Sequence, residues 1–348
     1  MNEQIINNTI PKSPVSLTPE DFVSSEMVRW CPGCGNHSIL KSMEKVFPVI
    51  GYKKENYVLV SGIGCSSRFP YYVNTYGFHG IHGRAMAIAS GVKISNPSLS
   101  TWIITGDGDS MAIGGNHFIH LIRRNIDVNL LMFNNQIYGL TKGQYSPTSP
   151  LGAITKTSPY GTIEHPFTPG ELALGAQGTF FARGIDVLPK LLTDIMFEAA
   201  RHDGTSVVEV LQNCVIFNDG AFDHITNREY RDDRTILLEH GKPMLFGKNK
   251  DKGLRWNVNS LEIITLGENG MGINDVLVHD AHNPDPGLHL SLAKMNWPDF
   301  PVALGVIRAA KFPTYDDLME EQIQKIKEQS KIKCMDDLLN SGDTWEVE

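Results

Sequence analysis

The sequence has no run of about 18 apolar residues, the length that a membrane-spanning helix needs. Its first 20 residues lack the basic start and the apolar segment of a secretory signal, so we expect neither membrane insertion nor secretion. Basic residues are fewer than acidic ones: the chain has 31 lysines and arginines and 39 aspartates and glutamates, which gives a formal net charge of −8. Because proteins that bind nucleic acid need a basic surface, we expect no nucleic-acid partner.

Cysteine is scarce too, with five residues among 348. An odd and sparse set does not suit a disulfide framework. Thiols stay reduced in the cytoplasm, and cysteines there are more often metal ligands or catalytic groups. We therefore predict a cytoplasmic protein whose cysteines are metal ligands or catalytic groups. The exception is Cys334, which lies in the C-terminal tail and belongs to no motif.

The rest of the composition is that of an ordinary globular protein, with 41% hydrophobic and 20% charged residues. The length suits about two domains, or one large α/β domain with extensions. Prolines before residue 20 disfavour a helix there, so we predict a flexible lead-in over residues 1–26. We place the main domain at 27–225 and a C-terminal extension, without an assigned role, at 226–348.

Short apolar runs alternate with helical patterns in the main domain. The runs predict buried strands at 57–61, 101–105, 128–133 and 206–211. The helical patterns lie at 37–47, 83–94, 111–124 and 188–202. This alternation predicts an α/β fold, a mostly parallel sheet with helices on both faces and ligands at the carboxyl ends of its strands. We also predict a functional loop region at 141–185 and a charged, solvent-facing helix at 315–329.

A Gly-Asp-Gly-Asp-Ser segment directly follows the predicted strand at 101–105. Asn134 and Asn135 follow the next strand, 28 residues after Asp107, which is the length of one strand–helix–strand unit. These side chains should therefore emerge at the same edge of neighbouring strands. Carboxylate and amide oxygens suit Mg²⁺, and glycines before a helix N-terminus let the backbone approach a phosphate. We predict a metal-bridged diphosphate here rather than two unrelated turns.

Four of the five cysteines form a second pattern. Cys31 and Cys34 make a C-x-x-C in a Pro-Gly turn, while Cys65 and Cys214 each follow a predicted strand. The last two thus lie at the sheet edge where the diphosphate is expected. Four thiolates suit Zn²⁺ or an iron–sulfur cluster. The alternatives are a redox-active C-x-x-C pair, and burial of Cys65 and Cys214 as small apolar residues.

The chain resembles the β subunits of 2-oxoacid:ferredoxin oxidoreductases in the stretch GDGDSMAIGGNHFIHLIRRNIDVNLLMFNNQIYGLTKGQYSPTS, where GDG followed by NN resembles the thiamine-diphosphate-binding motif. The resemblance covers residues 27–225 and implies the diphosphate-side domain of the thiamine-diphosphate-binding fold. It implies that Asp107 and Asn135 bind Mg²⁺ together with the Ile137 carbonyl. It also implies that Gly108 and Asp109 line the diphosphate.

The segments WCPGCG, GIGCSS and QNCVIFND match the positions at which this family holds one [4Fe–4S] cluster. The resemblance thus implies as cluster ligands Cys31, Cys34, Cys65 and Cys214. Further residues expected to bind the thiamine cofactor are Gly64, Ser66, His82 and Gly106. His82 belongs to an H-G-R that the family shares, and we expect it to contact the diphosphate or a partner subunit.

Arg68 and Leu140 are the expected substrate contacts. Arg68 follows the Cys65 segment, and its guanidinium can bind a carboxylate through two hydrogen bonds. Pairing of Arg68 with another acidic group is the alternative, and some family members carry lysine at this place. The resemblance places Leu140 beside the substrate side chain.

The implied reaction is the thiamine- and CoA-dependent oxidative decarboxylation of a 2-oxo acid, with electrons passing through the cluster to ferredoxin and with carboxylation as the reverse. In this family the glutamate that activates thiamine lies on an α subunit. We therefore expect the chain to act as a heteromer with that subunit, as (αβ)₂, and CoA to be bound mainly by the partner.

The segments HGR, YGLTKGQYSPTSP, ELALGAQGTFFAR and EVLQNCVIFND look most like the 2-oxoglutarate branch of the family. We therefore expect conversion of 2-oxoglutarate to succinyl-CoA and CO₂. Pyruvate and branched-chain 2-oxo acids are alternative substrates. A non-redox thiamine decarboxylase with a structural zinc site is a further alternative, and it would contain no iron.

Overall fold

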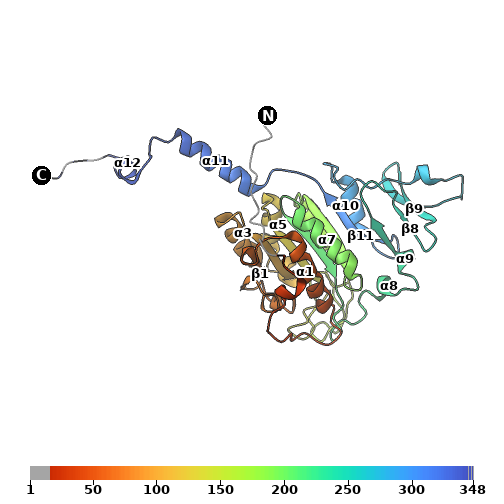
Figure 1. The fold of residues 1–348 in the computed structure, drawn as a ribbon. Coiled ribbons are helices and arrows are strands. Elements are labelled where there is room, and N and C mark those ends of the chain that lie inside the picture. The colour runs from red at the N-terminus through yellow and green to blue at the C-terminus, as the bar shows by residue number, and fades with distance from the viewer. Residues whose placement is uncertain (1–15, 344, 346, 348) are drawn as a thin grey trace.

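The computed structural model describes residues 16–343, 345 and 347 (Figure 1). At its centre is an eight-stranded sheet with the strand order β2-β1-β3-β4-β6-β5-β11-β7. These strands are β1 (Tyr57–Ser61), β2 (Tyr76–His79), β3 (Ser100–Gly106), β4 (Asn129–Asn134), β5 (Phe180–Ile185), β6 (Ser206–Leu211), β7 (Thr235–Leu238) and β11 (Val302–Ala309). Neighbouring strands run parallel except for β5 and β11. The predicted α/β class and mostly parallel sheet are confirmed.

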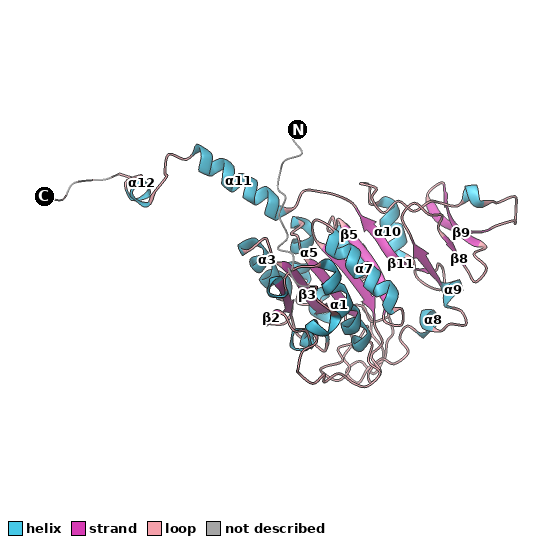
Figure 2. Cartoon of the chain, in the orientation of Figure 1, coloured by secondary structure: helices cyan, strands magenta, loops and turns pink. Residues whose placement is uncertain are grey.

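Helices cover both faces of this sheet (Figure 2). They are α1 (Asn36–Ile50), α2 (Phe69–Tyr72), α3 (Ala85–Ser95), α4 (Asp107–Met111), α5 (Gly115–Arg124), α6 (Pro169–Gly175), α7 (Pro189–Arg201), α8 (Asp223–Thr226), α9 (Arg231–Arg234) and α10 (Gly287–Lys294). Apolar side chains of α1 and α7 join Leu59 and Trp102 in one core. Those of α3, α5, α6 and α10 join Val60 and Ile103 in the other. Since successive strand residues point to opposite faces, continuous apolar strands suit a sheet buried on both sides.

The same sheet continues beyond residue 225, where we expected the main domain to end. β7 and β11 are two of its strands, so the C-terminal region begins inside the sheet rather than after it. A smaller antiparallel sheet contains β8 (Leu245–Phe246), β9 (Lys252–Asn257) and β10 (Ser260–Thr265). The predicted charged helix is α11 (Tyr315–Gln329), which projects from the body and is followed by α12 (Met335–Leu339) (Figure 1).

The predicted lead-in is wrong for the part that the structure describes. Residues 1–15 lie outside the described residues, but Pro19–Phe22 forms a 3₁₀ helix. The Phe22 ring is fully buried and packs edge-on against Phe47 and Tyr57, at centroid distances of 5.3 and 5.4 Å. The ordered core therefore includes residues before Met27.

Two further expectations about local structure need correction. The helix expected at 111–124 begins only at Gly115 as α5, because α4 ends at Met111 and the backbone leaves the helical region at Ala112 (φ −86°, ψ −106°). The region 141–185 is not all loop, since it contains α6 and β5. Among the described residues, no helix combines the length and apolar character needed to cross a membrane.

Candidate active site

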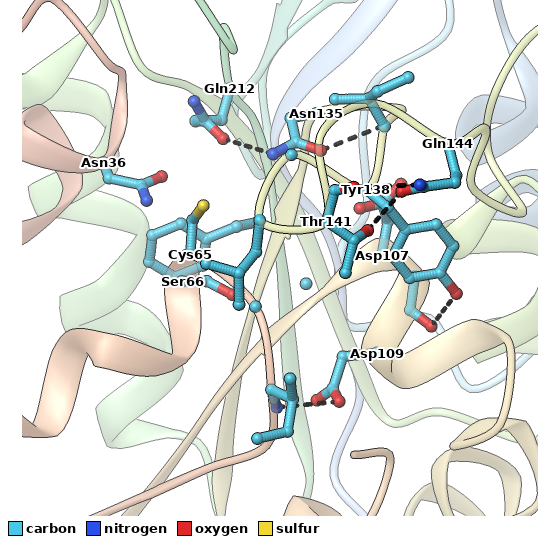
Figure 3. A pocket seen from close by; sticks show the side chains of 18 of the residues that line it. Asn36, Cys65, Ser66, Asp107, Asp109, Asn135, Tyr138, Thr141, Gln144 and Gln212 are labelled. Carbon is cyan, nitrogen blue, oxygen red and sulfur yellow. Dashed lines mark hydrogen bonds between the residues drawn. The ribbon is translucent and has the colours of Figure 1, made fainter. Parts of the chain in front are cut away.

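The carboxyl ends of β1, β3, β4 and β6 meet at one edge of the sheet, beside a cavity of about 500 Å³ (Figure 3). The predicted site residues that line this cavity are Gly64, Cys65, Ser66, His82, Gly106, Asp107, Gly108, Asp109, Asn135, Ile137 and Leu140. They come from separate stretches of sequence, and the parallel strand order brings them together as the spacing predicted.

Asp107 begins α4 directly after β3, and it is only 2% exposed. Its Oδ2 accepts hydrogen bonds from Ser146 Oγ at 2.5 Å and from Thr148 Oγ1 at 2.6 Å. Burial raises the pKa of Asp107, and these hydroxyls oppose that rise because they stabilise the carboxylate. Neither hydroxyl contacts Oδ1, which suits this oxygen to a cation. Sequence reasoning missed Ser146 and Thr148, whose only signal was a hydroxyl-rich segment in the loop.

Asn135 follows β4, and both ends of its carboxamide are fixed. Its Nδ2 donates to Gln212 Oε1 at 3.1 Å, and its Oδ1 accepts from the Ile137 backbone N–H at 3.2 Å. The preceding Asn134 instead donates from Nδ2 to the buried Glu209 at 2.7 Å. Asn135 is therefore the member of the Asn-Asn pair that lines the cavity.

The Asp109 carboxylate, expected to line a diphosphate, also holds loops together. Its Oδ1 accepts from the backbone N–H groups of Ile63 at 3.0 Å and Gly83 at 2.7 Å. The same oxygen contacts His82 Nδ1 at 2.6 Å, and Oδ2 accepts from Thr105 Oγ1 at 2.8 Å. Asp109 thus ties together the loops after β1 and before α3, and its negative charge is engaged there. The contact leaves His82 Nε2 available to a ligand.

Gly108 has no space for a side chain. A Cβ there would lie 2.3 Å from Tyr138 Cε1, while the Tyr138 hydroxyl donates to the Gly108 carbonyl at 2.9 Å. Burial, followed by the charges of Asp107 and Asp109, raises the pKa of Tyr138 to about 12. The hydroxyl therefore stays protonated at neutral pH and keeps the backbone after β3 in place.

A second cavity, of about 230 Å³, adjoins the first and is lined by the four predicted cysteines, Cys31, Cys34, Cys65 and Cys214. Residues that line both cavities are Asn36, Cys65, Asn135, Gly139, Leu140 and Gln212. Arg68 lines the cysteine cavity, and its Nε donates to the Tyr72 hydroxyl at 2.8 Å. Leu140 thus lines both cavities, whereas Arg68 lines only the cysteine cavity.

The cysteines are all free thiols, including the exposed Cys334. Burial raises the pKa of Cys34 to about 12 and also raises the pKa of Cys65, and neighbouring thiols add to both effects. A bound cation would offset this penalty on the thiolates. In the described part of the chain, no three His, Cys, Asp or Glu side chains are spaced for a single metal ion. A cluster of several irons holds its ligands farther apart than one ion does.

Asn36 is another residue that sequence reasoning missed. It is the first residue of α1, is 1% exposed and lines both cavities. Its Oδ1 is buried and has no hydrogen-bond partner among the described residues. Buried polar atoms are normally bonded, so an orphaned oxygen at a cavity wall suits a site that holds a ligand.

Comparison with known proteins identifies the family. Residues 62–210 match the family model described as thiamine pyrophosphate enzyme, C-terminal TPP binding domain. The chain is 45% identical over 345 residues to the 2-oxoglutarate oxidoreductase subunit KorB of Mycobacterium tuberculosis, a match that covers 98% of this chain and 92% of that protein. The chain belongs to the β subunits of the 2-oxoacid:ferredoxin oxidoreductases. The resemblance noted in the sequence is confirmed, and the chain is a subunit of an oxidoreductase.

Other relatives of this β subunit agree. It is 45% identical over 196 residues to the 2-oxoglutarate synthase subunit KorB of Archaeoglobus fulgidus, covering 56% of this chain and 73% of that protein. A solved structure of 2-oxoglutarate:ferredoxin oxidoreductase from Magnetococcus marinus, with 2-oxoglutarate, coenzyme A and succinyl-CoA bound, matches with a TM-score of 0.74 and 28% identity. That match covers 93% of this chain and 95% of that one, which supports the same fold throughout.

Proposed function

We propose that this β subunit carries the catalytic centre of an enzyme that converts 2-oxoglutarate and CoA to succinyl-CoA and CO₂. Two electrons leave in the reaction, one at a time, through a [4Fe–4S] cluster to two molecules of oxidised ferredoxin. The observation that carries the proposal is the shared wall between the cavity at the strand ends and the cavity of the four cysteines. A thiamine centre and a cluster held there would be close enough for electron transfer.

The residues of the larger cavity fit Mg²⁺ and thiamine diphosphate. Asp107, Asn135 and the Ile137 carbonyl would hold the ion, because together they offer hard oxygen ligands. When bound, thiamine diphosphate supplies a carbanion that adds to 2-oxo acids and an electron sink for the loss of CO₂. Further groups proposed to contact it are Gly64, Ser66, His82, Gly106 and Gly108. Asp109, whose carboxylate holds His82, is also proposed to line the diphosphate.

The residues of the smaller cavity fit an iron–sulfur cluster. Cys31, Cys34, Cys65 and Cys214 surround a space of about 230 Å³, whereas four thiolates on one zinc ion close to about 2.3 Å from it. The match of these four cysteines to the positions of the family's cluster ligands favours a cluster over the structural zinc site of the non-redox alternative.

The substrate assignment rests on the relatives, which are named for 2-oxoglutarate in Mycobacterium tuberculosis and Archaeoglobus fulgidus. Leu140 lines both cavities, so we propose that it contacts the substrate side chain. Arg68 lies beside the cysteines, where its guanidinium would attract a substrate carboxylate to the shared wall. Relatives named more broadly as 2-oxoacid:ferredoxin oxidoreductases keep pyruvate and branched-chain acids as alternatives.

We propose that the enzyme is an (αβ)₂ heteromer, with the α subunit completing the thiamine site and binding most of the CoA. The family to which the chain belongs supports the partner, since its members are named as β subunits. The same enzyme would run as a carboxylase when reduced ferredoxin is abundant. We also propose a cytoplasmic location, where the free thiols would stay reduced.

The test is anaerobic purification of the β subunit with its α subunit, followed by measurement of iron, sulfide, zinc and thiamine. We expect about four irons and four sulfides per chain. We also expect CoA-dependent reduction of ferredoxin with 2-oxoglutarate that exceeds the reduction with pyruvate. Cys214→Ser should lose iron, whereas Cys334→Ser should keep it. Zinc without sulfide, or a complex that reduces no ferredoxin, would refute the proposal.

A further inference from the structure

Gln212 lies between the two cavities and was not among the predicted site residues. It follows β6, and its backbone N–H donates to the Asn134 carbonyl at 2.9 Å, so the sheet hydrogen bonding continues to this residue. The side chain is only 1% exposed and lines both cavities. Its position is therefore set by the sheet itself rather than by a loose loop.

The oxygen and the nitrogen of the Gln212 carboxamide form hydrogen bonds with residues of different proposed cofactor sites. Its Oε1 accepts from Asn135 Nδ2 at 3.1 Å, a contact drawn in Figure 3. Its Nε2 donates to Cys34 Sγ at 3.4 Å and to the Asn213 carbonyl. One amide group thus joins a residue proposed to bind Mg²⁺ to a residue proposed to bind the cluster.

The C-x-x-C loop has to come close for this contact to form. A Cβ on Gly35 would lie 2.8 Å from Gln212 Cγ and 2.0 Å from Asp186 Oδ2. Only glycine permits this approach without displacement. On the other side, the Gly35 N–H donates to the Asn213 carbonyl at 3.3 Å, and Asp186 Oδ2 accepts from the Asn213 N–H at 2.8 Å. The loop and the end of β6 are therefore locked together around Gln212.

We propose that Gln212 is a positioning residue that couples the two cofactor sites, a role that rests on the proposed function. Its N–H contact with Cys34 stabilises negative charge on the sulfur, which favours the reduced cluster and raises its reduction potential. Its Oε1 holds the Asn135 carboxamide with Nδ2 toward Gln212 and Oδ1 toward Ile137, which orients the proposed Mg²⁺ ligands.

Two substitutions separate these contacts in the complex with the α subunit. Gln212→Glu keeps an oxygen that accepts from Asn135, removes the N–H donor to Cys34 and adds a carboxylate charge. Both of the last two changes should make the cluster potential more negative, while the Mg²⁺-dependent affinity for thiamine diphosphate is kept. Gln212→Leu removes both contacts and should also weaken that affinity by about 10-fold or more, the usual scale for residues that orient metal ligands.

The potential is measured by redox titration of the cluster's electron-paramagnetic-resonance signal, and the affinity by calorimetric titration with thiamine diphosphate and Mg²⁺. Gln144→Leu is the matched control, since Gln144 lines the larger cavity and its side chain contacts Thr141 rather than a cysteine. It should leave the potential at the wild-type value. If Gln212→Leu does not assemble, the potential of Gln212→Met decides, because methionine is neutral and also lacks the N–H donor.

An unchanged potential in the neutral variant Gln212→Leu or Gln212→Met, or an equal shift in Gln144→Leu, would overturn the coupling role. These outcomes differ from failure of the proposed function, which would appear in the wild-type complex as the absence of iron and sulfide. A wild-type complex with its cluster and activity, but with variants of unchanged potential and affinity, would refute only the role of Gln212.

Discussion

Thr148→Val should weaken the binding of Mg²⁺ and thiamine diphosphate without unfolding the β subunit. Thr148 is buried, and its Oγ1 lies 2.6 Å from Asp107 Oδ2 and 3.0 Å from Asn134 Oδ1, so its one proton goes to the nearer, charged oxygen of Asp107. Valine keeps the shape of the side chain but removes this hydrogen bond. Ser146 Oγ remains on the same carboxylate oxygen at 2.5 Å, so the Asp107 side chain keeps one anchor and loses the other.

The size of the effect follows from the charge on the acceptor. A hydrogen bond to an ionised group contributes about 1.5–3 kcal/mol. At about 1.4 kcal/mol per factor of ten, its loss corresponds to a decrease in affinity of about 10- to 100-fold. Measured losses after removal of groups that orient metal ligands fall in the same range, about 10- to 100-fold.

The assay is titration of the complex, freed of cofactor, with thiamine diphosphate at several Mg²⁺ concentrations. Thr157→Val is the control, because Thr157 is exposed in the same loop and, among the described residues, its hydroxyl hydrogen-bonds only to the Thr155 hydroxyl, at 3.3 Å. The control should bind as the wild type does. If Thr148→Val binds equally well at limiting Mg²⁺, the hydroxyl does not position Asp107 and the reasoning fails.

Three other changes test separate parts of the structure. Asp107→Ala should lose thiamine diphosphate but keep its iron, the reverse of Cys214→Ser, and equal cofactor contents in the two variants would contradict separate sites. Gly108→Ala should displace the Tyr138 ring, which lies 2.3 Å from the new Cβ, and so weaken cofactor binding in the same titration. Phe22→Ala should lower the free energy of unfolding by about 3–5 kcal/mol, measured by denaturant titration. A change below about 0.5 kcal/mol, the level typical of surface positions, would mean that Phe22 does not belong to the core.

The sequence predicted the site best where candidate ligand residues directly follow predicted strands. The segment around Asp107, the Asn135 position, Cys65 and Cys214 all follow predicted strands, and a parallel sheet brings strand ends together whatever the loop details. The predicted strand at 57–61 matches β1, and 206–211 matches β6. The cysteines and the predicted cavity residues accordingly line two adjoining cavities.

Contacts between distant loop residues could not be predicted in this way. Ser146 and Thr148 reach Asp107 from a loop about 40 residues away that has no periodic pattern, and Gln212 looked like an ordinary residue beside Cys214. Asp109 was assigned to the diphosphate by resemblance, and the additional contacts of its carboxylate with the N–H groups of two loops could not be foreseen. The hydrogen bonds of these side chains depend on which donors and acceptors the folded chain places beside them.

Two strands of the structure, β5 and β11, were not predicted from the sequence for a similar reason. Phe180–Ile185 follows a proline-rich segment, and Val302–Ala309 lies in a region without alternating helices and strands. Each is a short apolar run, which periodicity alone does not distinguish from a buried helix segment. Their pairing across about 120 residues decides that both are strands.

The position of β11 in the sheet has a consequence for the production of this protein. β5 pairs with β6 on one side and with β11 on the other, and its residues are all buried. A chain cut after residue 225 would contain the residues of both cofactor sites but would expose the whole hydrogen-bonding edge of β5. Exposed edges of apolar strands pair with other chains and lead to aggregation. During synthesis the same edge stays open until residue 309 has been made, so slow translation or heat in that interval favours misassembly before any cofactor is inserted.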